Sequence, residues 1–297
     1  MKRQVKELFV SSILLNLALS LVVIFEPIYL YKIGYSLQDL MLFYLIVYGA
    51  YLLLMPLGGK FARYKGYEAG LLVGSILFAT FYVVLFLIQD YSILFYIAPI
   101  IFALQKTFYW PAYYADFARF SDDDEEGREL SSFTVSTSLV YILGIAVAGF
   151  IISFWGYGIL FILSALLFIG SNIPTLLTKE KFKPQKFGYT SAFKDLFDKK
   201  NRKSLFAYIG FGQELIVMVI WPVFISLIIA DMKDLGLIVA LATLVTVIIS
   251  LYVGKISDSK NKRSILALGS AFYSVAWFIR IFIVNQLGIF FVDTMSR

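Results

Sequence analysis

The chain has 297 residues, of which 60% are hydrophobic and 15% are charged, and its mean hydropathy is +0.81. An average soluble domain carries about 25% charged residues, so this composition indicates a membrane protein. The chain contains neither Cys nor His, which excludes disulfides, thiolate chemistry, and catalysis or metal binding by imidazole. The net charge of +6 lies in short loops between apolar runs, a pattern that indicates anionic lipid rather than nucleic acid as the partner.

Continuous apolar runs of about 20 residues, the length that crosses a hydrocarbon core of ~30 Å, follow one another along the chain. Because the runs are continuous rather than alternating, they predict membrane-spanning helices. Nine complete spans are expected at 8–31, 39–57, 69–88, 92–115, 130–153, 157–177, 204–230, 234–253 and 264–284.

A tenth apolar segment begins near Gln286 and ends at Arg297. At 1.5 Å per residue this segment is too short to cross the bilayer. We therefore expect the sequence to be a C-terminally truncated form of a twelve-helix protein.

Lys and Arg gather in alternate loops, whereas the opposite loops hold only Lys32 and Lys233. Cytoplasmic loops of membrane proteins carry the excess of basic residues. The N-terminus and the basic segment 178–203 are therefore expected on the cytoplasmic side of a plasma (inner) membrane.

The two halves of the chain align with one another at one constant offset and without a gap. The matches include helix-breaking and loop residues, which chance aligns less readily than Leu with Leu: Pro27 with Pro222, Asp39 with Asp234, Gly59 with Gly254, Lys60 with Lys255, and Gly74 with Gly269. The repeat predicts an N-terminal six-helix half (1–177), a cytoplasmic linker (178–203) and a C-terminal half (204–297). A membrane repeat of this kind points to a transporter whose solute path lies between the halves.

The segment after the eighth span runs Gly254-Lys-Ile-Ser-Asp258-Ser-Lys-Asn-Lys262-Arg263. It resembles the G-x-x-x-D-x-x-x-[KR]-[KR] cytoplasmic loop of the major facilitator superfamily. In physical terms, a glycine lets a helix end turn tightly because it has no Cβ penalty at positive φ. The resemblance implies that this loop latches the two states of a transport cycle, and an ordinary positive-inside turn is the alternative.

Two further segments carry the same resemblance. The equivalent segment after the second span begins at Gly59 and has Arg63 where the family usually has Asp. The segment from Trp110 to Asp116, followed by Arg128, resembles the family's junction of helices 4 and 5. The resemblance covers essentially the whole chain. It implies an all-α polytopic bundle of two parallel six-helix repeats, the second incomplete, with helices 1, 4, 7 and 10 around a central cavity.

Ionisable side chains within the spans are candidates for function, because each costs about 2.5–3.5 kcal/mol at mid-membrane unless it is paired or hydrated. Lys106 and Glu214 lie about ten residues, or ~15 Å, from the inner ends of the fourth and seventh spans. The resemblance implies that they face one another across the cavity, as a substrate or proton site or as a structural ion pair. Glu26 would line the outer vestibule or face external water. Arg280 is expected to snorkel to the outer interface.

Further polar and aromatic side chains on the cavity helices would suit an organic solute with apolar faces and a few polar groups. They are Asn16, Gln105, Tyr109, Trp110, Gln213 and Trp221. Elsewhere, we expect Ser191–Lys203 to form an amphipathic surface helix, and Gly144, Ala148 and Gly149 to form a close-packing face on the fifth span.

The sequence has no nucleotide-binding Gly-Lys loop, no metal-ligand cluster and no Ser/His arrangement, so neither enzymatic activity nor a cofactor is expected. We expect secondary active transport of a small organic solute by alternating access, with coupling to protons through a carboxylate left open. The alternatives are a non-transporting membrane sensor or scaffold on the same fold, and a lipid flippase. The expected partners are the bilayer, the solute and, if coupling exists, protons.

Overall fold

The computed structural model of the chain describes residues 3–120, 126–177, 188–259 and 262–296. These residues form helices and no strand, which confirms the predicted all-α fold. The α-helices are α1 (Arg3–Val22), α2 (Phe25–Lys32), α3 (Leu37–Lys65), α4 (Tyr67–Leu87), α5 (Leu94–Phe120), α6 (Glu126–Gly170), α7 (Ile173–Leu176), α8 (Tyr189–Leu196), α9 (Arg202–Ile228), α10 (Met232–Ser259), α11 (Lys262–Arg280) and α12 (Gln286–Ser296).

Several helices have the length and composition of membrane spans. In the described part of the chain, five helical stretches are long and apolar enough to cross a membrane: Phe9–Lys32, Leu37–Lys65, Tyr67–Leu87, Val135–Leu176 and Met232–Val253. A shorter apolar stretch lies at Gly212–Ile228 in α9.

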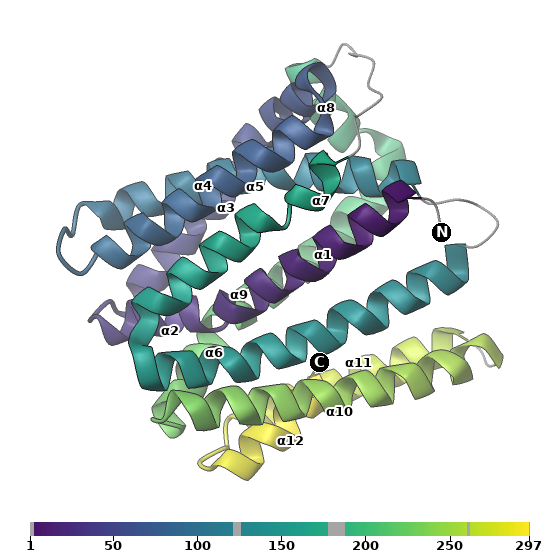
Figure 1. Ribbon diagram of the computed structural model, residues 1–297. Helices are drawn as coiled ribbons and strands as arrows, with labels where there is room; N and C mark the ends of the chain where they lie inside the picture. The colour runs from purple at the N-terminus through teal and green to yellow at the C-terminus, as the bar shows by residue number, and fades with distance from the viewer. Residues whose placement is uncertain (1–2, 121–125, 178–187, 260–261, 297) are drawn as a thin grey trace.

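The helices pack side by side as a bundle (Figure 1). On one side, α5 packs against α3 and α4; in the middle, α1 packs along α6; on the other side, α10 joins α6 to α11 and α12. The core contains many aromatic rings, including the stacked pairs Phe78 with Phe168 at 3.9 Å and Phe81 with Phe102 at 4.2 Å between ring centroids.

The first predicted span consists of two helices, α1 and α2, with a short turn between them. Pro27 lies in the first turn of α2. Proline has no N–H to donate to the preceding turn, and its ring collides with the carbonyl four residues earlier. The turn therefore comes directly before Phe25, the first residue of α2, and it sets the direction in which α2 leaves α1.

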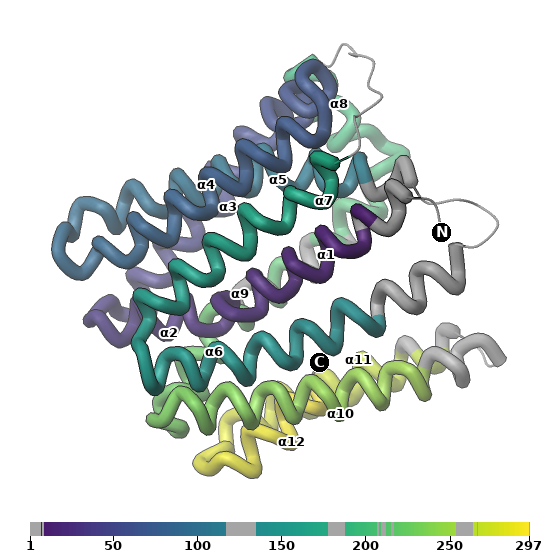
Figure 2. The backbone as a smooth tube through the Cα atoms, in the orientation of Figure 1, coloured from purple at the N-terminus to yellow at the C-terminus, as the bar shows by residue number. Residues whose placement is uncertain are grey.

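The predicted span 130–153 corresponds to the first arm of α6, and the predicted span 157–177 corresponds to its second arm together with α7. The two arms of α6 meet at Gly156 (Figure 2). Gly156 has φ of 80° and ψ of 177°, a backbone conformation that is essentially restricted to glycine. A helix cannot continue through this conformation, so the chain reverses there.

The glycines of the first arm of α6 form a close-packing face, as predicted. A Cβ added to Gly144 would collide with Oγ of Ser20 in α1. A Cβ added to Gly149 would collide with the carbonyl oxygen of Met232 and lie 3.2 Å from Cα of Gly236 in α10. The small residues thus bring α6 close to one helix of each half of the chain.

A polar contact joins α6 to the start of α10 next to the close approach at Gly149. It lies at the end of the bundle that is predicted to be on the non-cytoplasmic side of the membrane. The hydroxyl of Ser153 donates to Oδ1 of Asp231 at 3.1 Å, and the N–H of Lys233 donates to the same oxygen at 2.7 Å. The hydrogen bond from the Lys233 N–H, followed by the one from Ser153, holds the pKa of Asp231 below its ordinary value of 3.8. This carboxylate is therefore charged at neutral pH and joins the two helices.

Two helices, α3 and α10, extend furthest beyond their predicted spans. The second span was expected to end at residue 57, with Gly59 in a loop, but α3 continues to Lys65 and the chain turns at Gly66, which has φ of 106°. Likewise, α10 continues through Gly254 to Ser259. Polar residues beyond the apolar run keep their helical propensity, so the end of hydrophobicity does not mark the end of the helix.

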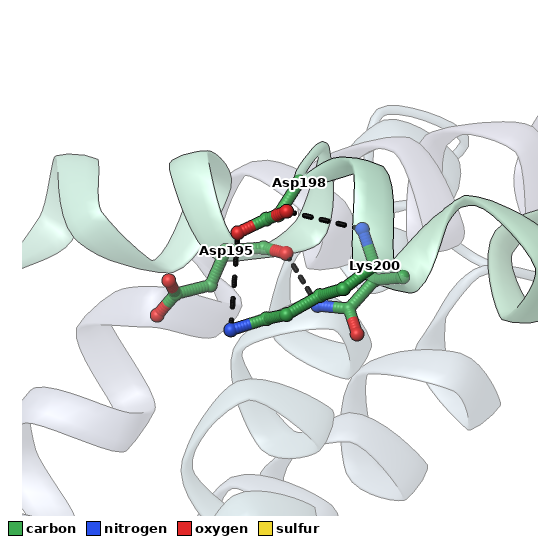
Figure 3. A network of polar contacts seen from close by, with 4 residues as sticks. Asp195, Asp198 and Lys200 are labelled. Carbon is green, nitrogen blue, oxygen red and sulfur yellow. Dashed lines mark hydrogen bonds and ion pairs between the residues drawn. The ribbon is translucent and has the colours of Figure 1, made fainter.

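The prediction of one amphipathic helix over Ser191–Lys203 is also wrong, because α8 ends at Leu196 and is followed by a short 3₁₀ turn, η1 (Lys199–Asn201). Asp198 has an extended backbone and caps this turn: its carboxylate accepts the N–H of Lys200 at 3.1 Å and lies 3.8 Å from the same residue's Nζ (Figure 3). The capped turn therefore separates α8 from α9.

Candidate functional site

A buried carboxylate lies inside the N-terminal half of the bundle. Glu26, in the first turn of α2, is 4% exposed. The hydroxyl of Tyr44 in α3 donates to its Oε1 at 2.7 Å, and the hydroxyl of Tyr82 in α4 donates to its Oε2 at 2.9 Å. Both carboxylate oxygens are therefore hydrogen-bonded, each by a different helix.

Lys106 of α5 supplies the opposite charge. The charges of Lys106 and Glu26 are close enough to attract one another. The Nζ of Lys106 also lies 4.1 Å from the centroid of the Phe102 ring and 5.5 Å from that of Tyr48, within the range of cation–π attraction. Lys106, Tyr44 and Tyr48 are partly exposed, whereas Glu26 is buried.

The arrangement, which we call the Glu26 cluster (Glu26, Tyr44, Tyr82 and Lys106), can bind a proton or a polar group. An isolated charge in a low-dielectric interior is costly, and here two charge-assisted hydrogen bonds and one cation offset that cost. A proton on Glu26, or an anionic solute group on Lys106, would change the balance between the two charges. The cluster draws on α2, α3, α4 and α5, so such a change acts on four helices at once.

An ion pair between Lys106 and Glu214 was one of the alternatives for these two residues. Both residues lie in the described part of the chain, and the structure records no ion pair between them. Glu214 of α9 instead accepts a hydrogen bond from the hydroxyl of Tyr273 in α11 at 2.9 Å. The carboxylate of α9 therefore accepts a hydrogen bond from one tyrosine, whereas the carboxylate of α2 accepts hydrogen bonds from two.

The remaining predicted solute-path residues have different environments. The side-chain amide of Asn16 donates to the backbone carbonyl of Ser12, one turn earlier in α1, at 2.8 Å. The hydrogen bond of this amide therefore stays within its own helix. Tyr109 is buried, with its ring 4.9 Å from that of Phe168, and it is part of the core. Of the other positions, Gln105 is buried, Trp110 is half-buried and Gln213 is exposed.

Trp221 belongs to a second buried cluster, in the C-terminal half. Its indole N–H donates to Oδ1 of Asp293 in α12 at 3.0 Å, and Asp293 is 2% exposed. The guanidinium of Arg280 lies 4.3 Å from the ring centroid of Trp221 and donates to the hydroxyl of Ser296 at 2.8 Å. The prediction that Arg280 snorkels is therefore wrong. It is buried, because α9 and α12 provide an aromatic face and a polar partner for it.

The predicted latch and helix-junction residues can be located only in part. Among those with described side chains, Arg63 is exposed near the end of α3, Gly59 is half-buried inside it, and Asp116 is buried in α5. The side chains of the other residues lie outside the described part: Asp258, Lys262, Arg263 and Arg128. The backbone of Gly254 is helical.

Sequence reasoning missed the partners of the buried charges. Tyr44 and Tyr82 are two of 20 tyrosines, and nothing in their local sequence distinguishes them. Asp293 could have been identified, because it is a carboxylate within the last apolar segment and such groups are rare in spans unless they are paired.

Comparisons with known proteins agree with the fold. A family model described as Major Facilitator Superfamily matches residues 8–295. Among solved structures, the chain is similar to the in meso crystal structure of the POT family transporter PepTSo, with a TM-score of 0.63 and 13% sequence identity over 100% of this chain and 81% of that one. No curated protein matches the chain. At this identity the structural likeness shows the fold alone.

Proposed function

Because this chain belongs to the Major Facilitator Superfamily, a family of transporters embedded in the membrane, we propose that it is a secondary transporter that moves a small organic solute by alternating access. The proposed halves are 1–177 and 204–297, joined by a cytoplasmic linker at 178–203. The N-terminus faces the cytoplasm of a cell bounded by an inner (plasma) membrane. This orientation rests on the basic loops, and the solute path on the two-half organisation.

The Glu26 cluster is the observation that carries the proposal. A carboxylate in a membrane span, hydrogen-bonded on both oxygens and attracted by a lysine, is a costly arrangement. We propose that Glu26 exchanges a proton, or that Lys106 exchanges a solute group, during each cycle. Glu214 and Trp221 are the proposed contributions of α9 to the same path.

The latch proposed for the cytoplasmic side consists of Gly59, Arg63, Gly254, Asp258 and the basic pair Lys262-Arg263. These residues would hold the inner ends of the helices together in one state and release them in the other. Its charged residues follow the apolar runs 39–57 and 234–253 in the sequence, so changing them should affect the cycle more than membrane insertion.

Proton movement driven by solute tests the proposal. The purified chain is reconstituted into vesicles that contain a pH-sensitive dye, and a panel of sugars, amino acids, short peptides and organic cations is added outside. We expect at least one class to move protons in the unmodified protein, and Glu26→Gln to abolish this movement, because glutamine keeps the shape of the side chain but cannot titrate.

Glu214→Gln is the matched comparison, since it removes the corresponding carboxylate from the other half. If only Glu214→Gln abolishes coupling, the assignment of Glu26 is wrong. If isotope-labelled solute crosses the membrane and protons do not, the protein transports without proton coupling. If no class of solute crosses at all, the non-transporting sensor or scaffold replaces the proposal.

A further inference from the structure

Outside the Glu26 cluster, two membrane-spanning helices enclose an apolar groove. It lies between α4 and the second arm of α6 and has a volume of about 710 Å³. Its floor includes the buried side chains of Tyr82, Phe161 and Ala165. Its walls include Val83, which is 57% exposed, and Leu166, which is 61% exposed. Apolar side chains that are this exposed within a span face lipid, so the groove is continuous with the lipid-facing surface.

The length of the groove matches one leaflet of a bilayer. Along α4 its lining runs from Ala79 to Leu87, and along the second arm of α6 it runs from Gly158 to Ile169. At 1.5 Å per residue these helical stretches are about 12 Å and about 16 Å long. One half of a ~30 Å hydrocarbon core has a similar thickness. Gln89 follows the end of α4, and Trp155 precedes the reversal at Gly156. A Trp and a polar side chain at the ends of spans are typical of the level at which lipid headgroups begin.

We propose that the α4–α6 groove binds one acyl chain of a phospholipid, with the lipid's ester region at the end formed by Gln89 and Trp155. Among the described residues that line the groove, none carries a charge. The groove therefore recognises the acyl chain and not the headgroup. The same absence of charge gives a headgroup no polar path through the groove, which makes it a resting site for lipid rather than a route for lipid flipping.

The groove and the Glu26 cluster share one side chain. The ring of Tyr82 forms part of the groove floor, while its hydroxyl donates to Glu26. An acyl chain packed on that ring holds the hydroxyl in place, so lipid in the groove supports the buried carboxylate. If Glu26 takes part in transport, lipid in the groove would support transport as well, and only this consequence rests on the proposed function. Acyl-chain binding does not depend on it.

Binding is tested by native mass spectrometry of the delipidated full chain, titrated with dioleoylphosphatidylcholine. Ala79→Phe and Ala165→Phe fill the groove from α4 and from α6, respectively. We expect each variant to weaken binding at least tenfold. Thr80→Phe adds similar bulk to the neighbouring, exposed position on α4 that does not line the groove, and we expect it to bind like the unmodified chain. Two groove variants are used so that one remains informative if the other fails to fold.

Equal affinity of folded Ala79→Phe and Thr80→Phe would overturn the proposal. So would saturable binding of glycerophosphocholine, which has the headgroup but no acyl chains, at the same site. Movement of a labelled phospholipid between leaflets that stops on filling the groove would also overturn it, in favour of flipping. These measurements need no transported solute, so their outcome is independent of the flux experiment.

Discussion

At the scale of single residues, the main feature is that a membrane-embedded carboxylate has a hydrogen-bond donor on each oxygen. Sequence reasoning could identify Glu26 and Lys106, because a charge within an apolar run is visible as such. It could not identify Tyr44 and Tyr82, because phenol groups are common in this chain and their orientation is set by how α3 and α4 pack around α2. It could place Lys106 and Glu214 at a matched depth in the membrane, but matched depth says nothing about which way each helix faces.

Removing one of the two tyrosine hydroxyls that donate hydrogen bonds to Glu26 should destabilise the protein. Hydrogen bonds to charged groups contribute about 1.5–3 kcal/mol, so we expect Tyr82→Phe to lower the free energy of unfolding by roughly 2 kcal/mol, with the ring and its packing kept. Tyr157→Phe is the control, because its hydroxyl donates only to the sulfur of Met232 at 3.5 Å. The measurement is unfolding of the detergent-solubilised protein.

The same experiment in a Glu26→Gln background separates the hydrogen bond from other effects. The loss caused by Tyr82→Phe should shrink there, because the acceptor is no longer charged. An equal loss in both backgrounds would mean that the Tyr82 hydroxyl does not act through the carboxylate.

At the scale of elements, the sequence predicted helix starts better than helix ends. The start of α3 is marked by Ser36 and Asp39, whose side chains each accept a hydrogen bond from the other's backbone N–H in a capping box. The ends were missed because α3 and α10 extend beyond the apolar run. The helix starts also follow the repeat: α10 begins at the position that aligns with the start of α3, and α11 at the position that aligns with the start of α4. The two-fold repeat of the whole architecture stays a prediction.

The reversal within α6 gives a prediction with a clear control. A Cβ at Gly156 would meet open space, so Gly156→Ala tests the backbone alone. Residues held in this region of φ and ψ cost about 1–3 kcal/mol, and we expect a loss of stability of that size. Gly170→Ala also meets open space, at the helical end of α6. It should be neutral or stabilising by about 0.5–1 kcal/mol, because alanine favours the helix over glycine. Similar thermal stability of the two variants would contradict the strained reversal.

At the scale of the whole molecule, the described contacts between the N-terminal helices and α10 gather around the start of α10. Gly149 and Gly236 bring two backbones together, and the hydrogen bond between Ser153 and Asp231 lies about one turn further along. On the same side, α2 packs against α9. In a protein that works by alternating access, contacts of this kind are made in one state and broken in the other. The sequence predicts two halves, but not which of their ends touch, since in the proposed cycle the same helices would serve both states.

A reversible cross-link therefore tests alternating access directly. The chain has no cysteine, so Ser153→Cys with Asp231→Cys introduces the only thiols. Oγ of Ser153 and Oδ1 of Asp231 lie 3.1 Å apart, so cysteines at these two positions would face one another. A disulfide forms where their Cβ atoms can approach to about 3.8 Å. We expect oxidation to stop solute flux in vesicles and a reductant to restore it, because the disulfide prevents this end of the bundle from opening. Each single cysteine variant should be insensitive to oxidation. The cross-link is verified by mass spectrometry. Full flux through the oxidised double variant would show that the contact between α6 and α10 does not open during transport. The alternating-access proposal would then have to place its moving contact elsewhere.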